Sequence, residues 1–391
     1  MTNPAWKTEQ RHTIRELWKE AVATSPDTVF LHLLDDAAKY TYAEFDKLSN
    51  RLAQGLLSNG IAPGDRIATL LDSHADSVAL LIAASKVNAV YVPINTANKG
   101  EFLRNPLANS GARVLISEAQ YCERVEAIRE GLPDLQTIYI RGDSSAGATA
   151  GESFTHLYSD NSADTDICPD PGDIAGIIYT GGTTGPSKGC ILSQNYIANQ
   201  ALRTREMCDP RLGEVNWTCL PLFHLNAIVV TLLYSVVSGT TAAITPRFSL
   251  SGFWADIEKS GAAVASVLGS MIPLIANMPD NEEMLRCKGQ LRMARGAPFP
   301  GELQEVWRDR FGEYLMTLNE KLATVQTKFK SKKSRYNSFG KYYFRSAEDI
   351  LEATKPFLLE LGVSVIVSEQ IVSADPFPIM ETTAAISDGE T

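Results

Sequence analysis

Near the start of the chain, hydrophobic residues recur with a helical period. Between residues 41 and 57, one helical face gathers the apolar side chains of Phe45, Leu48, Leu52 and Leu56. Thr41 stands just before this stretch, and Glu44 follows at the spacing of a capping box, in which each residue bonds the other's backbone N–H. The pattern therefore predicts a helix over 41–57.

Apolar runs of strand length then alternate with helical patterns. The expected strands are 66–71, 89–93, 113–116 and 137–140. The expected helices are 75–86 and 125–130. Strands that alternate with helices are typical of a parallel sheet, so the fold class is α/β.

Residues 141–172 lose this periodicity and are rich in Ser, Asp, Gly and Pro, which indicates a linker or surface loop. A second α/β unit is expected from Ile174 to about Phe311, with apolar segments at 242–244 and 263–268. The longest apolar run, 227–237, is too short to span a bilayer, and the polar N-terminus does not resemble a signal peptide. We therefore expect no membrane insertion.

Composition narrows the class of protein. The 391 residues are 44% hydrophobic and 21% charged, which is ordinary for a soluble globular chain. The net charge of −10 argues against nucleic-acid binding by the chain as a whole, although a local basic patch stays possible. The six cysteines are scattered without a C-x-x-C pair, so we expect reduced thiols and a cytoplasmic protein rather than a zinc site or disulfides.

The segment with the strongest chemical signal is 179–189, YTGGTTGPSKG, directly after the apolar run 174–178. Glycines let the backbone approach an anion, hydroxyls and N–H groups donate to phosphate oxygens, and Lys188 adds a positive charge. Ser187 precedes this lysine where a Walker A loop has Gly, so the segment is not a P-loop of that type. We interpret it as a polyphosphate-binding loop; the alternative is a flexible connector.

This loop resembles the signature loop of the adenylate-forming superfamily, which includes acyl-CoA synthetases, luciferases and peptide-synthetase adenylation domains. Gly181 replaces a usual Ser, and Ser187 replaces a usual Pro. Segments 41–45, 63–68 and 88–95 also resemble the family's early motifs, in the family's order. The resemblance implies an incomplete αβαβα N-terminal domain made of two α/β subdomains, at 1–168 and 169–314, plus a small α+β segment at 315–391.

The same resemblance implies the reaction and its residues. A carboxylate attacks the α-phosphate of Mg-ATP, pyrophosphate leaves, and the acyl-adenylate passes to a thiol, usually coenzyme A. In 220–224, LPLFH, His224 would lie beside the entry to the acyl pocket, whereas alone it would more often be a core histidine. The loop 295–298, RGAP, would pack along the adenine ring. The implied catalytic residues are His224 and Lys188, and the implied ATP-binding residues are Thr180, Gly181, Gly182, Thr183, Thr184, Gly185, Lys188, Gly296, Ala297 and Pro298.

The resemblance weakens after Gly312. The family continues with an aromatic-Gly-x-Thr-Glu motif that serves phosphate and magnesium, but 313–320 reads EYLMTLNE. The family's later aspartate, which binds ribose, and its C-terminal lysine domain are not recognised either. We therefore expect impaired turnover, and the metal ligands stay unknown.

A basic segment follows. Every charged residue from Lys321 to Arg345 is basic, and aromatic residues are interleaved. Cations for phosphates and rings for stacking are typical of single-stranded nucleic-acid binding, although a solvated basic helix followed by a loop fits the composition equally well. The candidate contacts are Lys328, Lys330, Lys332, Lys333, Arg335, Tyr336, Tyr342, Tyr343 and Arg345.

Segments 318–322 and 339–351, with a hairpin-like stretch at 364–387, resemble the start of phage Erf-type single-strand annealing proteins. Met316 stands where such a protein would begin. The resemblance implies that single-stranded DNA is a partner of 321–345. Because a ligase fragment joined to an annealing-protein fragment has no evident physical purpose, our hypothesis is a gene-level fusion or an assembly artefact. Sequencing the source DNA across codons 312–318 tests it.

Overall fold

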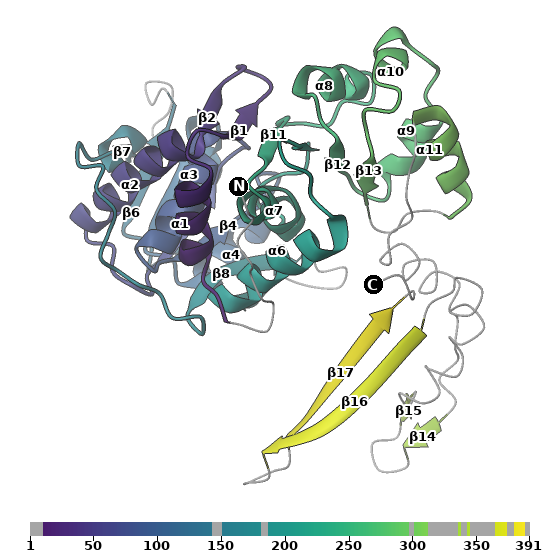
Figure 1. Cartoon of the computed structure of the whole chain (residues 1–391). Helices are drawn as coiled ribbons and strands as arrows, with labels where there is room; N and C mark the ends of the chain where they lie inside the picture. Colours follow the sequence, from purple (N-terminus) through teal and green to yellow (C-terminus); the bar gives the residue numbers. More distant parts are fainter. Residues whose placement is uncertain are drawn as a thin grey trace. The chain divides into compact units, whose positions relative to one another are not determined.

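A computed structural model describes residues 11–142, 151–180, 187–296, 301–311, 335–337, 342–344, 364–373 and 379–387. The chain forms two compact units. The first comprises Met1–Val267 and Pro279–Arg295, and the second comprises Leu268–Met278 and Gly296–Thr391. The two larger sheets and most helices belong to the first unit, and two two-stranded sheets belong to the second (Figure 1).

The first sheet has 7 strands in the order β7-β6-β5-β3-β4-β8-β9. Its strands are β3 (Arg66–Leu70), β4 (Val90–Pro93), β5 (Val114–Glu118), β6 (Thr137–Arg141), β7 (Glu152–Ser153), β8 (Ile174–Thr180) and β9 (Lys188–Ser193). Neighbours pair in parallel except β8 and β9, which are antiparallel. The predicted parallel sheet is thus confirmed.

The second sheet has 6 strands in the order β13-β12-β10-β11-β1-β2. Its strands are β1 (Val29–Leu33), β2 (Lys39–Thr41), β10 (Val215–Thr218), β11 (Thr241–Ile244), β12 (Val264–Ser266) and β13 (Met293–Arg295). All pairs are parallel except β1 with β2. Each sheet takes strands from both sides of residue 168, and the division into 1–168, 169–314 and 315–391 stays a prediction.

Helices separate and cover the sheets. The α-helices are α1 (Ile14–Thr24), α2 (Tyr42–Ser58), α3 (Ala75–Lys86), α4 (Glu101–Ser110), α5 (Cys122–Glu126), α6 (Gln194–Cys208), α7 (Tyr234–Ser238), α8 (Phe253–Ser260), α9 (Met271–Ala276), α10 (Glu282–Arg286) and α11 (Gln304–Phe311). Shorter 3₁₀ segments are η1 (Ala119–Tyr121), η2 (Arg129–Gly131), η4 (Phe154–Leu157) and η6 (Gly301–Leu303), and η5 (Ala227–Leu233) is a π-helix.

These elements form αβαβα layers, as the resemblance implied. Helix α1 contacts α2, α3, α6 and α7, while α2 contacts β1 and α3 contacts β4, so this group lies between the two sheets. On the other face of the first sheet, Leu107 of α4 and Val125 of α5 join one buried cluster with the strands. Phe253 of α8 packs edge-on against Trp217 of β10, with ring centroids 5.3 Å apart, and covers the second sheet.

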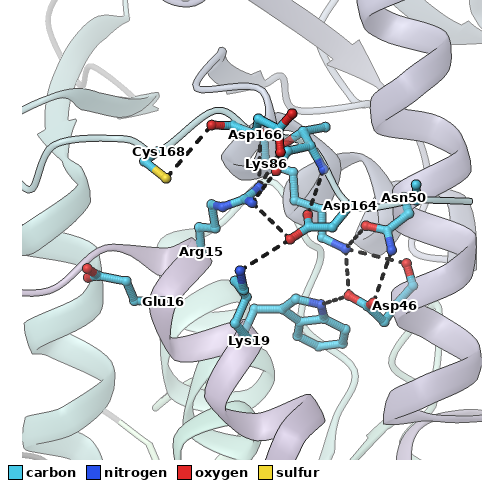
Figure 2. Close-up of polar contacts among 12 residues, drawn as sticks. Arg15, Glu16, Lys19, Asp46, Asn50, Lys86, Asp164, Asp166 and Cys168 are labelled. Carbon is cyan, nitrogen blue, oxygen red and sulfur yellow. Dashed lines mark hydrogen bonds and ion pairs between the residues drawn. The ribbon is translucent and has the colours of Figure 1, made fainter.

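The buried Lys86 of α3 contacts polar residues of α2, between the two sheets (Figure 2). Lys86 is 1% exposed, and its ammonium donates to Asp46 Oδ1 at 2.6 Å, Asn50 Oδ1 at 2.6 Å and Ser49 Oγ at 2.8 Å. Burial lowers the pKa of Lys86, while Asp46 opposes that change. With all its donors used, Lys86 has a structural role.

One expectation needs correction, and the structure decides between the two alternatives of another. The helix expected over 125–130 ends at Glu126, because α5 buries only Cys122 and Val125 and so has a single turn of apolar face. Of the linker or surface loop expected at 141–172, the described part is a surface loop: Asp164 accepts from Arg15 at 2.9 Å, and Ser159 O accepts from Arg51 Nε at 2.7 Å. It is therefore part of the first unit.

In the second unit, Arg310 of α11 donates to the carbonyl oxygens of Ala276 and Met278 next to α9. Strands β14 (Arg335–Asn337) and β15 (Tyr342–Phe344) pair antiparallel, as do β16 (Ser364–Ser373) and β17 (Ile379–Ser387). The hairpin-like pattern at 364–387 is thus confirmed. Within the described ranges, no helix has the length and apolar character needed to cross a membrane.

Candidate active site

The candidate phosphate loop connects the antiparallel strands β8 and β9. Thr180 and Lys188 are register partners, and the Thr180 hydroxyl donates to Lys188 O at 3.4 Å. Helix α4 holds both ends of the loop, since Asn105 Nδ2 donates to Ser187 O at 2.9 Å and the Tyr179 hydroxyl donates to Asn109 Oδ1 at 2.8 Å. Lys188 is exposed, so its ammonium is available to a ligand in solvent.

Close packing beside the loop requires glycine at 189. A Cβ added at Gly189 would lie 2.8 Å from Ile177 Cγ2 and 3.1 Å from the Tyr179 ring. Of the loop itself, 181–186 lies outside the described residues, so the expected contacts of Gly181, Gly182, Thr183, Thr184 and Gly185 stay predictions.

His224 follows β10 in a tight turn, in which its N–H donates to Pro221 O at 3.0 Å. Its ring lies 4.6 Å from that of Phe223, and the residue is exposed rather than part of the core. Desolvation lowers the pKa of His224, which favours the neutral imidazole at pH 7. A neutral ring can donate one hydrogen bond, from its N–H, to a neighbouring carboxylate.

The remaining predicted residues are only partly described. Gly296 is half-buried after β13, whereas Ala297 and Pro298 lie outside the described residues. In the basic segment, Tyr336 of β14 pairs with Tyr343 of β15, and Arg335 and Tyr342 lie on the same hairpin. The candidates outside the described residues are Lys328, Lys330, Lys332, Lys333 and Arg345. Across the described part of the chain, no group of three or more His, Cys, Asp or Glu fits a metal ion, so no step is assigned to Mg²⁺.

The structure also contains a cleft that sequence reasoning missed, of about 570 Å³. It lies where β3, β4, β5, β10 and β11 end, the usual position of ligand sites in α/β sheets. The cleft is lined by Leu71, Asp72, Ser73, Asn95, Thr96, Ala97, Lys99, Gln120, Tyr121, Arg124, Pro221, Phe223, Pro246 and Arg247. Because its bases outnumber its acids, we call it the basic cleft.

The one carboxylate among these lining residues is already engaged. Asp72 accepts from the Tyr121 hydroxyl at 2.8 Å and from Gln120 Nε2 at 2.9 Å. Arg124 donates to Thr96 O at 2.8 Å and stacks over the Tyr121 ring at 4.8 Å, which fixes its guanidinium at the cleft. Such a site suits an anionic ligand. Its residues come from separate loops, so the one signal in the sequence that could have found it is the rule that ligands bind at the carboxyl ends of parallel strands.

A buried polar network supports the wall of the basic cleft. His74 Nε2 and Glu118 Oε1 are 2.7 Å apart, while Asp76 accepts from Arg141 Nε at 2.6 Å and from the Tyr158 hydroxyl at 2.5 Å. Burial alone would raise the pKa of Glu118, but the hydrogen bond and charge of His74, with Arg141, outweigh it and lower that pKa. The network fixes the loops that follow β3, β5 and β6.

Comparisons with known proteins give matches to two families and to individual relatives. A family model described as AMP-binding enzyme matches residues 18–344, and a second model, of the ERF superfamily, matches 318–391. The long-chain-fatty-acid–CoA ligase FadD13 of Mycobacterium tuberculosis is 28% identical over 313 residues, which cover 78% of this chain and 58% of that protein. The crotonobetaine/carnitine–CoA ligase of Escherichia coli is 27% identical over 286 residues, 71% of this chain and 54% of that protein.

Solved structures show the same fold. The N-terminal domain of FACL13 from Mycobacterium tuberculosis superposes with a TM-score of 0.67 and 25% identity, over 76% of this chain and 73% of that one. An anthranilate CoA ligase, AuaEII, has a TM-score of 0.71 at 18% identity, over 80% of this chain and 60% of that one. The chain spans little more than half the length of the curated relatives described above.

Proposed function

The chain belongs to the family of AMP-binding enzymes, and from this we propose that it is an acid–thiol ligase that uses ATP, a carboxylic acid and coenzyme A. The observation that carries the proposal is the β8–β9 hairpin, whose glycine- and threonine-rich loop ends at the exposed Lys188. The similarity to acyl-CoA ligases supports the same class.

In the proposed reaction, a carboxylate oxygen forms a bond to the α-phosphorus of ATP while the bond from that phosphorus to the pyrophosphate oxygen breaks. The thiol of coenzyme A then attacks the acyl carbon, loses its proton to solvent and displaces AMP. Lys188 and the amides of its loop hold the phosphates, because fixed donors and charge stabilise the growing negative charge. Neutral His224 orients the carboxylate near the acyl entry.

The basic cleft supports the proposed second step, in which the acyl group passes to the thiol of coenzyme A. Coenzyme A carries several phosphate groups, and the cleft offers Lys99, Arg124 and Arg247 against the engaged Asp72. Guanidinium and ammonium groups are the usual partners of phosphate. We therefore assign this cleft to the phosphates of coenzyme A.

We further propose that turnover is impaired in this chain, because residues 313–320 do not carry the family's Thr-Glu motif. The test measures ATP binding and pyrophosphate release with a panel of carboxylic acids, for the wild type and Lys188→Ala. ATP binding that depends on Lys188, with release near the variant's level, is the expected result. Release far above that of Lys188→Ala contradicts the impairment, and absence of ATP binding contradicts the ligase class.

A second function, single-stranded DNA binding by 316–391, is supported by the ERF superfamily match and by the basic, aromatic-rich segment. We propose that 321–345 contacts the phosphates and bases. Fluorescence anisotropy with labelled single-stranded DNA should show binding that weakens steeply with salt, since phosphate contacts release counterions. Absence of binding at low salt removes this proposal.

A further inference from the structure

Arg295 ends strand β13 beside a buried apolar cluster. In the register of the second sheet, Arg295 pairs with Ser266, and Met293 pairs with Val264. Met293 and Arg295 share one face of β13, because side chains alternate along a strand. On that face, Val264 and Met293 form a buried cluster with Tyr234 and Cys208. The guanidinium carbon of Arg295 lies 4.4 Å from the centroid of the Tyr234 ring.

The guanidinium of Arg295 is poorly satisfied. Among the residues that the structure describes, its buried Nε and Nη2 have no hydrogen-bond partner, and Nη1 contacts only Cys208 Sγ, a weak acceptor, at 3.9 Å. The Tyr234 hydroxyl and Ser266 Oγ are also buried without a partner in this part of the chain. Arg295 is half-buried, and leaving the buried nitrogens of a charged guanidinium without an acceptor is costly. The arrangement therefore favours a bound anion.

Among the described residues, the carboxylate of Glu214 does not meet this need. Glu214 is already paired with Arg292, which donates to both of its oxygens, one of them at 2.6 Å. Around Tyr234, the charges of Arg292 and Arg295 exceed that of Glu214. The excess charge selects for a negatively charged ligand group.

The position of this cluster connects it to the acid substrate. Tyr234 directly follows the π-helix η5, which begins three residues after His224, and π-helices are rare and concentrate at functional sites. We propose that Arg295 binds a second carboxylate at the far end of the acid, so that the substrates are dicarboxylic acids. This inference rests on the proposed ligase function and deepens it.

The test compares two acyl-sulfamoyladenosines, which mimic the acyl-adenylate without reacting. One carries a six-carbon acyl chain that ends in a methyl group, and the other carries the same chain ending in a carboxylate. Calorimetry measures both with the full-length chain, with Arg295→Met, and with Arg203→Met, an exposed arginine on α6. ATP is titrated in parallel.

The wild type should bind the carboxylate-ended analogue at least tenfold more tightly, since a charge-assisted hydrogen bond is worth about 1.5–3 kcal/mol. Arg295→Met should bind the two analogues with equal affinity, because it lacks the group that contacts the second carboxylate, while Arg203→Met should match the wild type. Equal wild-type affinities overturn the inference, as does a loss in Arg295→Met that is the same for both analogues and for ATP, which indicates a nucleotide contact. If neither analogue nor ATP binds, the proposed ligase function fails as well.

Discussion

Glu118, at the wall of the basic cleft, should make the free energy of unfolding depend on pH. Its pKa lies below the ordinary value of 4.5, so its stabilising contribution is complete above about pH 4.5 and is lost as pH falls through the folded-state pKa. Glu118→Gln should lower the free energy of unfolding by about 2 kcal/mol at pH 7, because a buried charged hydrogen bond is weakened. Denaturant unfolding across pH 3–7, with the exposed Glu123→Gln as control, measures this. If the difference in the free energy of unfolding between Glu118→Gln and the wild type is the same at pH 3 as at pH 7, the lowered pKa of Glu118 is contradicted.

Replacing Lys86 tests whether its hydrogen bonds to Asp46 and Asn50 stabilise the fold. Lys86→Met keeps a long side chain but removes the donor to Asp46 and Asn50, so we expect the free energy of unfolding to fall by about 3 kcal/mol. Lys19→Met, at a lysine side chain that is 60% exposed, is the matched control and should change stability little. Chemical denaturation gives both values. Equal stability of the two variants would show that the Lys86 network adds nothing to the fold.

Among the helices, α2 has a contact that only glycine permits. A Cβ added at Gly55 would lie 1.7 Å from the carbonyl oxygen of Leu157 in η4. Gly55→Ala should therefore push η4 away and lower the free energy of unfolding by about 1–3 kcal/mol, despite the higher helix propensity of Ala. Ser58→Ala, at an exposed position of α2, should leave stability within about 0.5 kcal/mol of the wild type. An unchanged melting temperature in Gly55→Ala would mean that η4 does not pack as described.

Local signals predicted individual elements well. The capping box of Thr41 and Glu44 is present, and α2 runs from 42 to 58 against the expected 41–57. Helix α3 has the predicted bounds 75–86, because its start and end depend on nearby residues. Pairings between distant segments were not predictable: β1 joins β11, so that Leu31 lies beside Ala242, and no local pattern encodes that register.

The candidate site likewise combines features that a local sequence motif predicts with features that depend on residues far apart in the chain. Contiguous motifs at 179–189 and 220–224 predict the phosphate loop and His224, and these roles stay predictions. The basic cleft instead combines single residues from separate loops, such as Lys99, Arg124 and Arg247. The sequence places Arg295 in the predicted adenine loop 295–298. Only the packing against Tyr234 shows that its guanidinium has buried nitrogens without a partner among the described residues.

At the scale of the whole molecule, the basic cleft is where loops from both sheets meet. Arg124→Ala should weaken binding of coenzyme A about tenfold and reduce its salt dependence, because one charged phosphate contact is lost. The exposed Lys47→Ala on α2 is the control. Calorimetric titrations at two salt concentrations provide the comparison. Unchanged affinity in Arg124→Ala would remove coenzyme A from this cleft and leave the nucleotide loop unaffected.

The central claim is that the β8–β9 hairpin holds the phosphates of ATP. Titration of the full-length chain with ATP, for the wild type, Lys188→Ala and the exposed Lys288→Ala, tests it most directly. The account predicts saturable binding that is about tenfold weaker in Lys188→Ala and unchanged in Lys288→Ala, since only Lys188 supplies a charge-assisted bond to phosphate. Equal affinities for the wild type and Lys188→Ala would contradict the account.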